Sequence, residues 1–341
     1  MESRVLERLG CTAPVLAAPM AGGPTTPALV VAAAAAGSAG FLAAGYRTAE
    51  ALGDLVEEVR ATTPSYGVNL FTPPVVPVDR VAYATYRERL RPLADDYGVD
   101  LPIVPVEDDD DWHAKVELLT TVGPPVVSFT FGIPDAGTVA VLRRAGSLLV
   151  QTVTSAGEAR LAVGAGLDAL VVQSADAGGH WGTLTPADPP DRPALPQLVA
   201  AVRAAVDLPI VAAGGVGTRD DVRAALAAGA EAVAVGTALL LSPEAGTNPA
   251  HRVGLSGPDR GEQLTTRAFS GRPAGGLRNE FVTAYDGLAP LGYPALHHLT
   301  SPIRRAAAAA GDPEHVNLWA GSGYRRAEAR PAGEILEVLA P

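Results

Sequence analysis

Residues 209–244 read PIVAAGGVGTRDDVRAALAAGAEAVAVGTALLLSPE, and they contain the repeating unit that decides the fold. The middle of this stretch, residues 218–229, has the period of a helix, with Val222, Ala225 and Leu226 on one face. An apolar run precedes it and another follows it. The apolar runs do not alternate with polar residues, which indicates strands that are buried on both faces. The stretch therefore predicts a parallel β-α-β unit.

Similar apolar runs recur along the chain, each followed by a turn and a segment of helical period. They are residues 15–20, 40–45, 66–71, 126–132, 148–153, 169–174, 208–215 and 232–237. This count predicts an α/β fold with a (β/α)8 TIM barrel. The same repeat builds a doubly wound open sheet, but no GxGxxG follows the first run, which favours the barrel.

The ends of the helices carry their own signals. Capping boxes are predicted at Ser155 with Glu158 and at Thr218 with Asp221. Glycines are predicted to end several helices: Gly37, Gly146, Gly166 and Gly229.

Two insertions interrupt the repeat and predict a smaller, mostly helical cap over the catalytic end of the barrel. We assign residues 74–102 and 244–320 to this cap or substrate domain. Residues 1–73, 103–243 and 321–341 are assigned to the barrel.

Composition narrows the class of protein. The chain has 341 residues, 48% of them hydrophobic, and a net charge of −11, which disfavours nucleic acid as a partner. A single cysteine excludes an internal disulfide framework, and the lack of a Cys/His ligand cluster predicts no metal site. The first ten residues lack a secretory signal, and the uncharged stretch 28–45 is predicted as a buried helix, turn and strand rather than a membrane span. We expect a cytoplasmic protein with no membrane partner.

The ends of the predicted strands carry the residues suited to a binding site, because TIM barrels place function there. Carboxamides at Asn69, Gln151 and Gln173 would suit a planar polar ligand with donors and acceptors. Glycines end the last two strands, Gly214 and Gly215 in one and Gly236 before Thr237 in the other. Because these turns expose backbone N–H groups, they predict a phosphate pocket.

His180 is the predicted catalytic residue, since it follows a strand within AGGHWG, residues 177–182. Other polar residues receive structural interpretations. His297 and His298 are expected to face solvent, and the acidic run 107–111 is expected to be a solvated loop. Surface positions are favoured for Arg272 and Arg278 over anion binding, while Trp181 and Trp319 fit a pocket wall or the core equally well.

At the level of motifs, the sequence resembles the nitronate monooxygenase family, formerly called 2-nitropropane dioxygenases. The resemblance covers nearly the whole chain in the family's order. Its pieces are APMAGG (18–23), GVNLF (67–71), VSFTFG (127–132), VQTVTSAGEA (150–159), VVQSADAGGHWG (171–182), the stretch 209–244, SGRPAGGLRN (270–279) and NLWAGSG (317–323). It implies an FMN enzyme with a TIM barrel and a smaller substrate domain.

The resemblance also implies roles for individual residues. His180 matches the family's active-site histidine. Flavin contacts are implied for Ala18, Pro19, Met20, Asn69, Gln173 and Gly178, and phosphate contacts for Gly215, Ala234, Val235, Gly236 and Thr237. Gly179 would let the backbone pass close to the flavin ring, and Gly214 and Gln151 are retained as cofactor residues from their places at strand ends.

The implied reaction is oxidation of alkyl nitronates, such as propionate 3-nitronate, by FMN and O2 to a carbonyl compound and nitrite. His180 would bind the nitro oxygens or take the α-proton of a nitroalkane. The alternative is a related FMN- and NAD(P)H-dependent enoyl-acyl-carrier-protein reductase. A degenerate flavin or nucleotide-binding scaffold is the third possibility, which an intact His180 disfavours.

Overall fold

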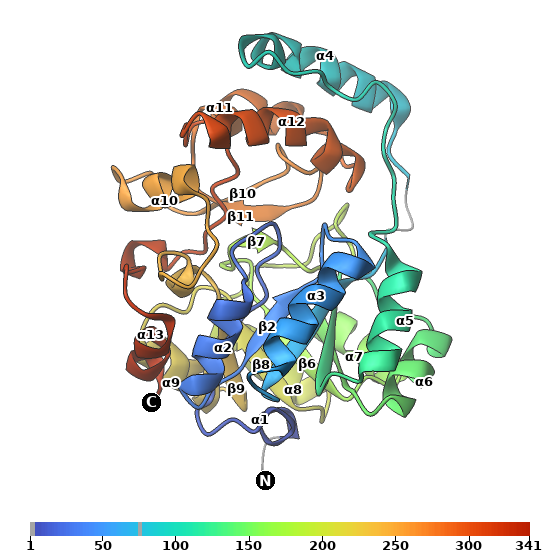
Figure 1. Ribbon diagram of the computed structural model, residues 1–341, viewed down its shortest axis with the longest axis vertical. Helices are drawn as coiled ribbons and strands as arrows, with labels where there is room; N and C mark the ends of the chain where they lie inside the picture. Colours follow the sequence, from blue (N-terminus) through green and yellow to red (C-terminus); the bar gives the residue numbers. More distant parts are fainter. Residues whose placement is uncertain (1–3, 74–76) are drawn as a thin grey trace.

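The computed structural model describes residues 4–73 and 77–341, and its centre is a closed barrel of eight parallel strands (Figure 1). The strand order is β1-β2-β3-β4-β5-β6-β8-β9, and β9 closes the barrel on β1 through the pairing of Leu16 with Ala234. The strands are β1 (Val15–Ala17), β2 (Gly40–Ala43), β3 (Tyr66–Phe71), β4 (Val126–Thr130), β5 (Leu148–Val153), β6 (Ala169–Gln173), β8 (Ile210–Ala213) and β9 (Ala232–Val235). The predicted (β/α)8 barrel is confirmed, and the open sheet is excluded.

Helices surround the barrel because each strand is apolar on both faces. In α9, Val222 and Ala225 are fully buried against the strands, as the helical period predicts. The surrounding helices are α2 (Pro27–Ala35), α3 (Ala49–Arg60), α5 (Trp112–Val122), α6 (Ala136–Arg144), α7 (Ala156–Gly164), α8 (Leu195–Ala205), α9 (Arg219–Ala227) and α13 (Ala332–Leu339). The short α1 (Arg4–Leu9) places Val5 and Leu9 against the bottom of the barrel.

The predicted helix ends agree with the structure at all but one position. Gly37, Gly146, Gly166 and Gly229 have positive φ angles, and Thr218 forms a complete capping box with Asp221. The box at Ser155 is only half formed. Ser155 Oγ accepts from Glu158 N, but the Glu158 carboxylate accepts from Thr154 N at 2.5 Å and Leu184 N at 2.7 Å. Glu158 thus holds the segment that follows His180 instead of closing its own cap.

The uncharged stretch 28–45 forms most of α2, a turn and β2, as predicted. No helix in the described part of the chain is long and apolar enough to cross a membrane.

The insertions pack together above the barrel around a hydrophobic core of their own (Figure 1). Tyr86 and Leu90 of α4 (Arg80–Asp96) share this core with Phe269 and Leu299, and the Tyr86 hydroxyl donates to Ala268 O at 2.6 Å. The second insertion contains α10 (Pro249–Ser256), β10 (Leu264–Thr266), β11 (Ala274–Gly276), α11 (Glu280–Tyr285) and α12 (Ala295–Ala309). Three 3-10 turns complete the chain: η1 (Thr237–Leu239), η2 (Asp286–Leu288) and η3 (Tyr324–Arg326). The first domain boundaries, at residues 1 and 74, lie outside the described residues.

A small antiparallel sheet, ordered β10-β11-β7, joins the cap to the barrel. Strand β7 (Gly179–His180) comes from the loop after β6, and Ala274 of β11 pairs with His180. The two backbones are so close at this point that a Cβ at Gly275 would lie 2.1 Å from Ala177 O. The sheet therefore fixes His180 under the cap.

The acidic run 107–111 is a largely exposed loop, as expected, but one of its carboxylates is engaged in specific contacts. Asp110 accepts a hydrogen bond from Tyr46 N at 2.7 Å and forms an ion pair of 2.8 Å with the buried Lys115. The acidic side chains find donors in the loop after β2, which sequence separation hides. The run thereby holds Tyr46 in place.

Candidate active site

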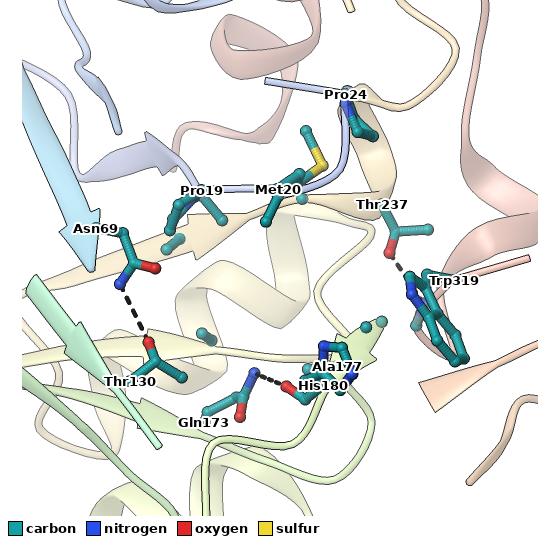
Figure 2. A pocket seen from close by; sticks show the side chains of 18 of the residues that line it. Pro19, Met20, Pro24, Asn69, Thr130, Gln173, Ala177, His180, Thr237 and Trp319 are labelled. Carbon is teal, nitrogen blue, oxygen red and sulfur yellow. Dashed lines mark hydrogen bonds between the residues drawn. The ribbon is translucent and has the colours of Figure 1, made fainter. Parts of the chain in front are cut away.

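A cavity of about 280 Å³ opens at the carboxyl ends of the barrel strands, under the cap (Figure 2). The predicted site residues that line it are Ala18, Pro19, Met20, Asn69, Gln173, Gly178, Gly179, His180, Gly214, Gly215, Ala234, Val235, Gly236 and Thr237. Because they come from six strands and the loops after them, only closure of the barrel brings them together.

Gln151 does not belong to this set. Its neighbours Val150 and Thr152 line the cavity, so the intervening side chain points the other way along the strand. The Gln151 amide is fully buried and donates to Gly132 O at 3.1 Å. We therefore assign Gln151 to the support of the loop after β4 and not to ligand binding.

One end of the cavity lies at the carboxyl ends of β8 and β9 and is lined mainly by backbone atoms. Gly214 and Gly215 have φ angles of 109° and 75°, which residues with a Cβ rarely adopt. Within the described residues, the N–H groups of Gly215, Gly236 and Thr237 have no acceptor. Thr237 Oγ1 accepts from Gly321 N at 2.9 Å, which ties the turn to the chain near the C-terminus. These free donors suit an anionic group such as a phosphate.

Two carboxamides lie along the middle of the cavity and have different partners (Figure 2). Asn69 Nδ2 donates to Ser128 Oγ at 2.9 Å and to Thr130 Oγ1 at 3.1 Å. Both ends of the Gln173 amide hold the histidine loop, since Nε2 donates to His180 O at 3.2 Å and Oε1 accepts from Gly182 N at 2.6 Å. Gln173 therefore positions His180 in addition to lining the cavity.

His180 faces the cavity from β7. Its Nε2 lies 2.8 Å from Ser270 Oγ. Aromatic rings surround the imidazole, with centroid distances of 5.5 Å to Phe131, 5.4 Å to Tyr293 and 5.8 Å to Trp319. Burial, together with the nearby cations of Arg272 and Arg304, lowers the pKa of His180 to about 3. The imidazole is therefore neutral at pH 7, with one ring nitrogen carrying a proton and the other a lone pair.

Arg272 is buried, so the expected surface position is wrong. Its guanidinium carbon lies 4.1 Å from the centroid of the Phe131 ring, and Nη2 donates to Thr183 O. Thr183 Oγ1 in turn donates to Glu158 at 2.9 Å, which brings a carboxylate near the cation. Arg278 is exposed, as expected.

The two adjacent histidines of α12 do not both face solvent. His297 lines the cavity, and its ring stacks on Tyr46 at a centroid distance of 3.9 Å. His298 points to the neighbouring side of the helix and lies 2.8 Å from Asp108. The solvent-facing prediction is wrong for His297, because the cap packs α12 against the mouth of the barrel.

The comparisons with known proteins agree with this geometry. The family model described as nitronate monooxygenase matches residues 3–341. The chain belongs to the nitronate monooxygenase family. It is an oxidoreductase of a family that is flavin-dependent and acts on nitronates and nitroalkanes.

Individual relatives resemble the chain over nearly its full length. A probable nitronate monooxygenase of Staphylococcus aureus strain Newman is 33% identical over 98% of this chain and 95% of its own. The crystal structure of nitroalkane oxidase from Streptomyces ansochromogenes has a TM-score of 0.92 and 42% identity, covering 98% of this chain and 96% of that one. FabK from Thermotoga maritima has a TM-score of 0.76 and 26% identity, covering 99% and 95%.

The glycine end of the cavity fits the phosphate of a flavin. A Cβ at Gly215 would lie 2.9 Å from the Cβ of Asp176 and 3.0 Å from Ser322 Oγ, so only glycine leaves this turn open. The N–H groups without acceptors, described above, are the donors that a phosphate requires.

Several residues of the cavity were not singled out from the sequence. Ser270, Phe131 and Arg304 have no assigned role there, although all contact His180 or line the cavity. A signal exists for the last of these. His297, Thr300 and Arg304 fall at i, i+3 and i+7, which places polar residues on one face of α12.

Proposed function

We propose that this enzyme oxidises alkyl nitronates, such as propionate 3-nitronate, with FMN as cofactor and dioxygen as oxidant. The products would be a carbonyl compound and nitrite. One observation carries the proposal: the neutral imidazole of His180 faces a cavity whose one end is a glycine cradle for a phosphate. Membership of the nitronate monooxygenase family supports the class of reaction.

We assign the FMN phosphate to the N–H groups of Gly215, Gly236 and Thr237, for which residues 4–73 and 77–341 provide no acceptor. The flavin ring would lie against residues 18–20 and Asn69, with Gly178 and Gly179 leaving room beside it. When bound, the flavin supplies one-electron redox chemistry, and dioxygen is the final acceptor.

His180 would act on the substrate in one of two ways. As a hydrogen-bond donor it would orient the nitro oxygens of a nitronate. As a neutral base it would take the α-proton of a nitroalkane, for which a free lone pair is needed. Ser270, 2.8 Å from Nε2, would hold the ring in position for either role.

Anaerobic mixing of the holoenzyme with candidate reductants tests the proposal. We expect propane 2-nitronate or propionate 3-nitronate to bleach the flavin absorption, while NADPH leaves it unchanged. Chromatography of the released cofactor should identify FMN.

The other outcomes decide among the alternatives. Rapid bleaching by NADPH alone would replace the proposal with the enoyl-acyl-carrier-protein reductase. A protein that cannot be reconstituted with FMN would point to a scaffold without catalysis.

A further inference from the structure

The cap end of the cavity carries a cation that has no carboxylate beside it in the described parts of the chain. Arg304 of α12 lines the cavity, and its guanidinium lies against four neutral partner atoms, one of which is His297 Nδ1 at 3.3 Å from Nη2. Nε donates to Thr300 Oγ1 at 3.0 Å, Nη1 to Asn317 Oδ1 at 3.1 Å and Nη2 to His297 O at 2.8 Å. These bonds orient the guanidinium but leave its charge uncompensated.

No Asp or Glu is among the described residues that line the cavity. Burial lowers the pKa of Arg304 to about 10, so the group remains cationic at pH 7. Burying a charge without a partner is costly, and a bound anion removes that cost. Arg272 differs, because Glu158 lies near it through Thr183.

The position of Arg304 separates it from the phosphate end. Asn317, Trp319 and Gly321 line the cavity in alternation, while Leu318 and Ala320 are buried in the core behind them. Trp319 N also donates to Asn317 O at 2.9 Å, so the segment turns at Leu318 while it runs along the cavity wall. Asn317 binds Arg304 at one end of this segment, and Gly321 binds Thr237 at the other.

Trp319 stands between these two ends, with its ring 5.8 Å from the His180 ring. The order along the cavity is therefore phosphate cradle, catalytic imidazole, cation. A ligand anion that pairs with Arg304 lies beyond His180, where the substrate and not the cofactor phosphate is expected.

We propose that Arg304 binds an oxyanion of the substrate, either the nitronate group itself or a carboxylate on the same molecule. The assignment rests on the proposed function and deepens it. Arg304 is then the residue that selects anionic substrates, and His297 and Asn317 position its fork.

Nitrite provides a test that does not require turnover. The oxidised holoenzyme is titrated with sodium nitrite, and the change in flavin absorption is recorded for the wild type, Arg304→Met and Arg304→Lys. We expect Arg304→Met to weaken nitrite binding about 10- to 100-fold, as for loss of a charge-assisted hydrogen bond. Arg304→Lys keeps the charge without the fork and should fall between the two.

A matched control is Arg305→Met, which removes the exposed neighbour on the same helix and should change nitrite binding less than twofold. Flavin content and thermal unfolding report whether each variant folds. Should Arg304→Met fail to fold, Arg304→Lys decides by itself. Wild-type nitrite affinity in a folded Arg304 variant overturns the assignment.

Kinetics with two substrates identify the anion. If the KM of propane 2-nitronate rises in Arg304→Met, the nitronate group binds at Arg304; if only that of propionate 3-nitronate rises, its carboxylate does. No rise in either contradicts the proposal. A wild-type enzyme that consumes neither nitronate contradicts the proposed function alone, because the nitrite titration still tests the anion site.

Discussion

At the carboxyl ends of β8 and β9, backbone N–H groups and glycines line the cavity. At the cap end, the side chains of Arg304 and His297 line it. The first end is built from consecutive residues of the barrel repeat. The second depends on a helix inserted after the repeat has ended. In the proposed assignment, cofactor binding and substrate selection belong to separate parts of the chain, and substitutions at one end should leave the other intact.

The largest effect is expected where the two ends meet. Replacing His180 with Ala should reduce turnover of a nitronate about 10²- to 10⁴-fold, because the positioned donor or base is lost. Flavin content should not change, since the glycine cradle is untouched. Steady-state oxygen consumption and the absorption spectrum measure the two quantities. The control is His113→Ala, which removes an exposed histidine. Unchanged turnover in His180→Ala would refute a catalytic role for His180.

A substitution in the glycine cradle should instead reduce flavin content. Gly215→Ala places a Cβ 2.9 Å from Asp176 at a φ of 75°, a strain of about 1–2 kcal/mol before any loss of phosphate contacts. We expect the protein to lose flavin during purification.

Gly98→Ala controls for backbone strain, because Gly98 has a φ of 63° and an added Cβ meets nothing within 4 Å. Equal flavin loss in both variants would mean that strain, and not the cradle, explains the result.

A milder change at the same end removes one hydrogen bond. Thr237→Val deletes the acceptor of Gly321 N at nearly constant volume. The loss of about 1 kcal/mol should weaken flavin binding about fivefold. Fluorescence titration of the apoprotein with FMN measures the affinity. The control is Thr120→Val on the exposed side of α5. If the control weakens FMN binding equally, the hydrogen bond between Thr237 and Gly321 does not contribute to FMN affinity.

The last prediction concerns acid stability. His180 has an unfolded pKa of 6.5 and a folded pKa of about 3, so between these values the unfolded chain binds a proton that the folded chain excludes. The free energy of unfolding should therefore fall as the pH drops from 7 to 5. Urea unfolding should show a smaller fall in His180→Ala. An equal fall would mean that His180 is protonated in the folded protein at pH 5.

Most of the barrel was predictable from sequence because its signals are local. Apolar runs, helical period and terminal glycines each depend on neighbours a few residues away. The lining of the cavity by thirteen cofactor candidates and His180 agrees with the rule that barrel function gathers at the carboxyl ends of strands, and the family resemblance supplied Ala18, Pro19, Gly178, Ala234 and Val235. Gln151 departs from this because alternation along β5 turns its side chain away from the cavity.

The cap was not predictable at the level of side chains. The carboxylate of Glu158 turns from its own helix cap to the segment after β7, Asp110 reaches the loop after β2, and Arg272 is buried on Phe131. Each partner lies far away in sequence or on another element, so no local pattern reports it.

The sequence by itself determined the closed barrel, the glycine turns and the histidine after the sixth strand, since these depend on backbone geometry that short segments encode. Only the tertiary structure decided which side chains of the cap face the cavity. That choice depends on how α12 is docked on the barrel, and docking is set by packing between segments separated by more than a hundred residues.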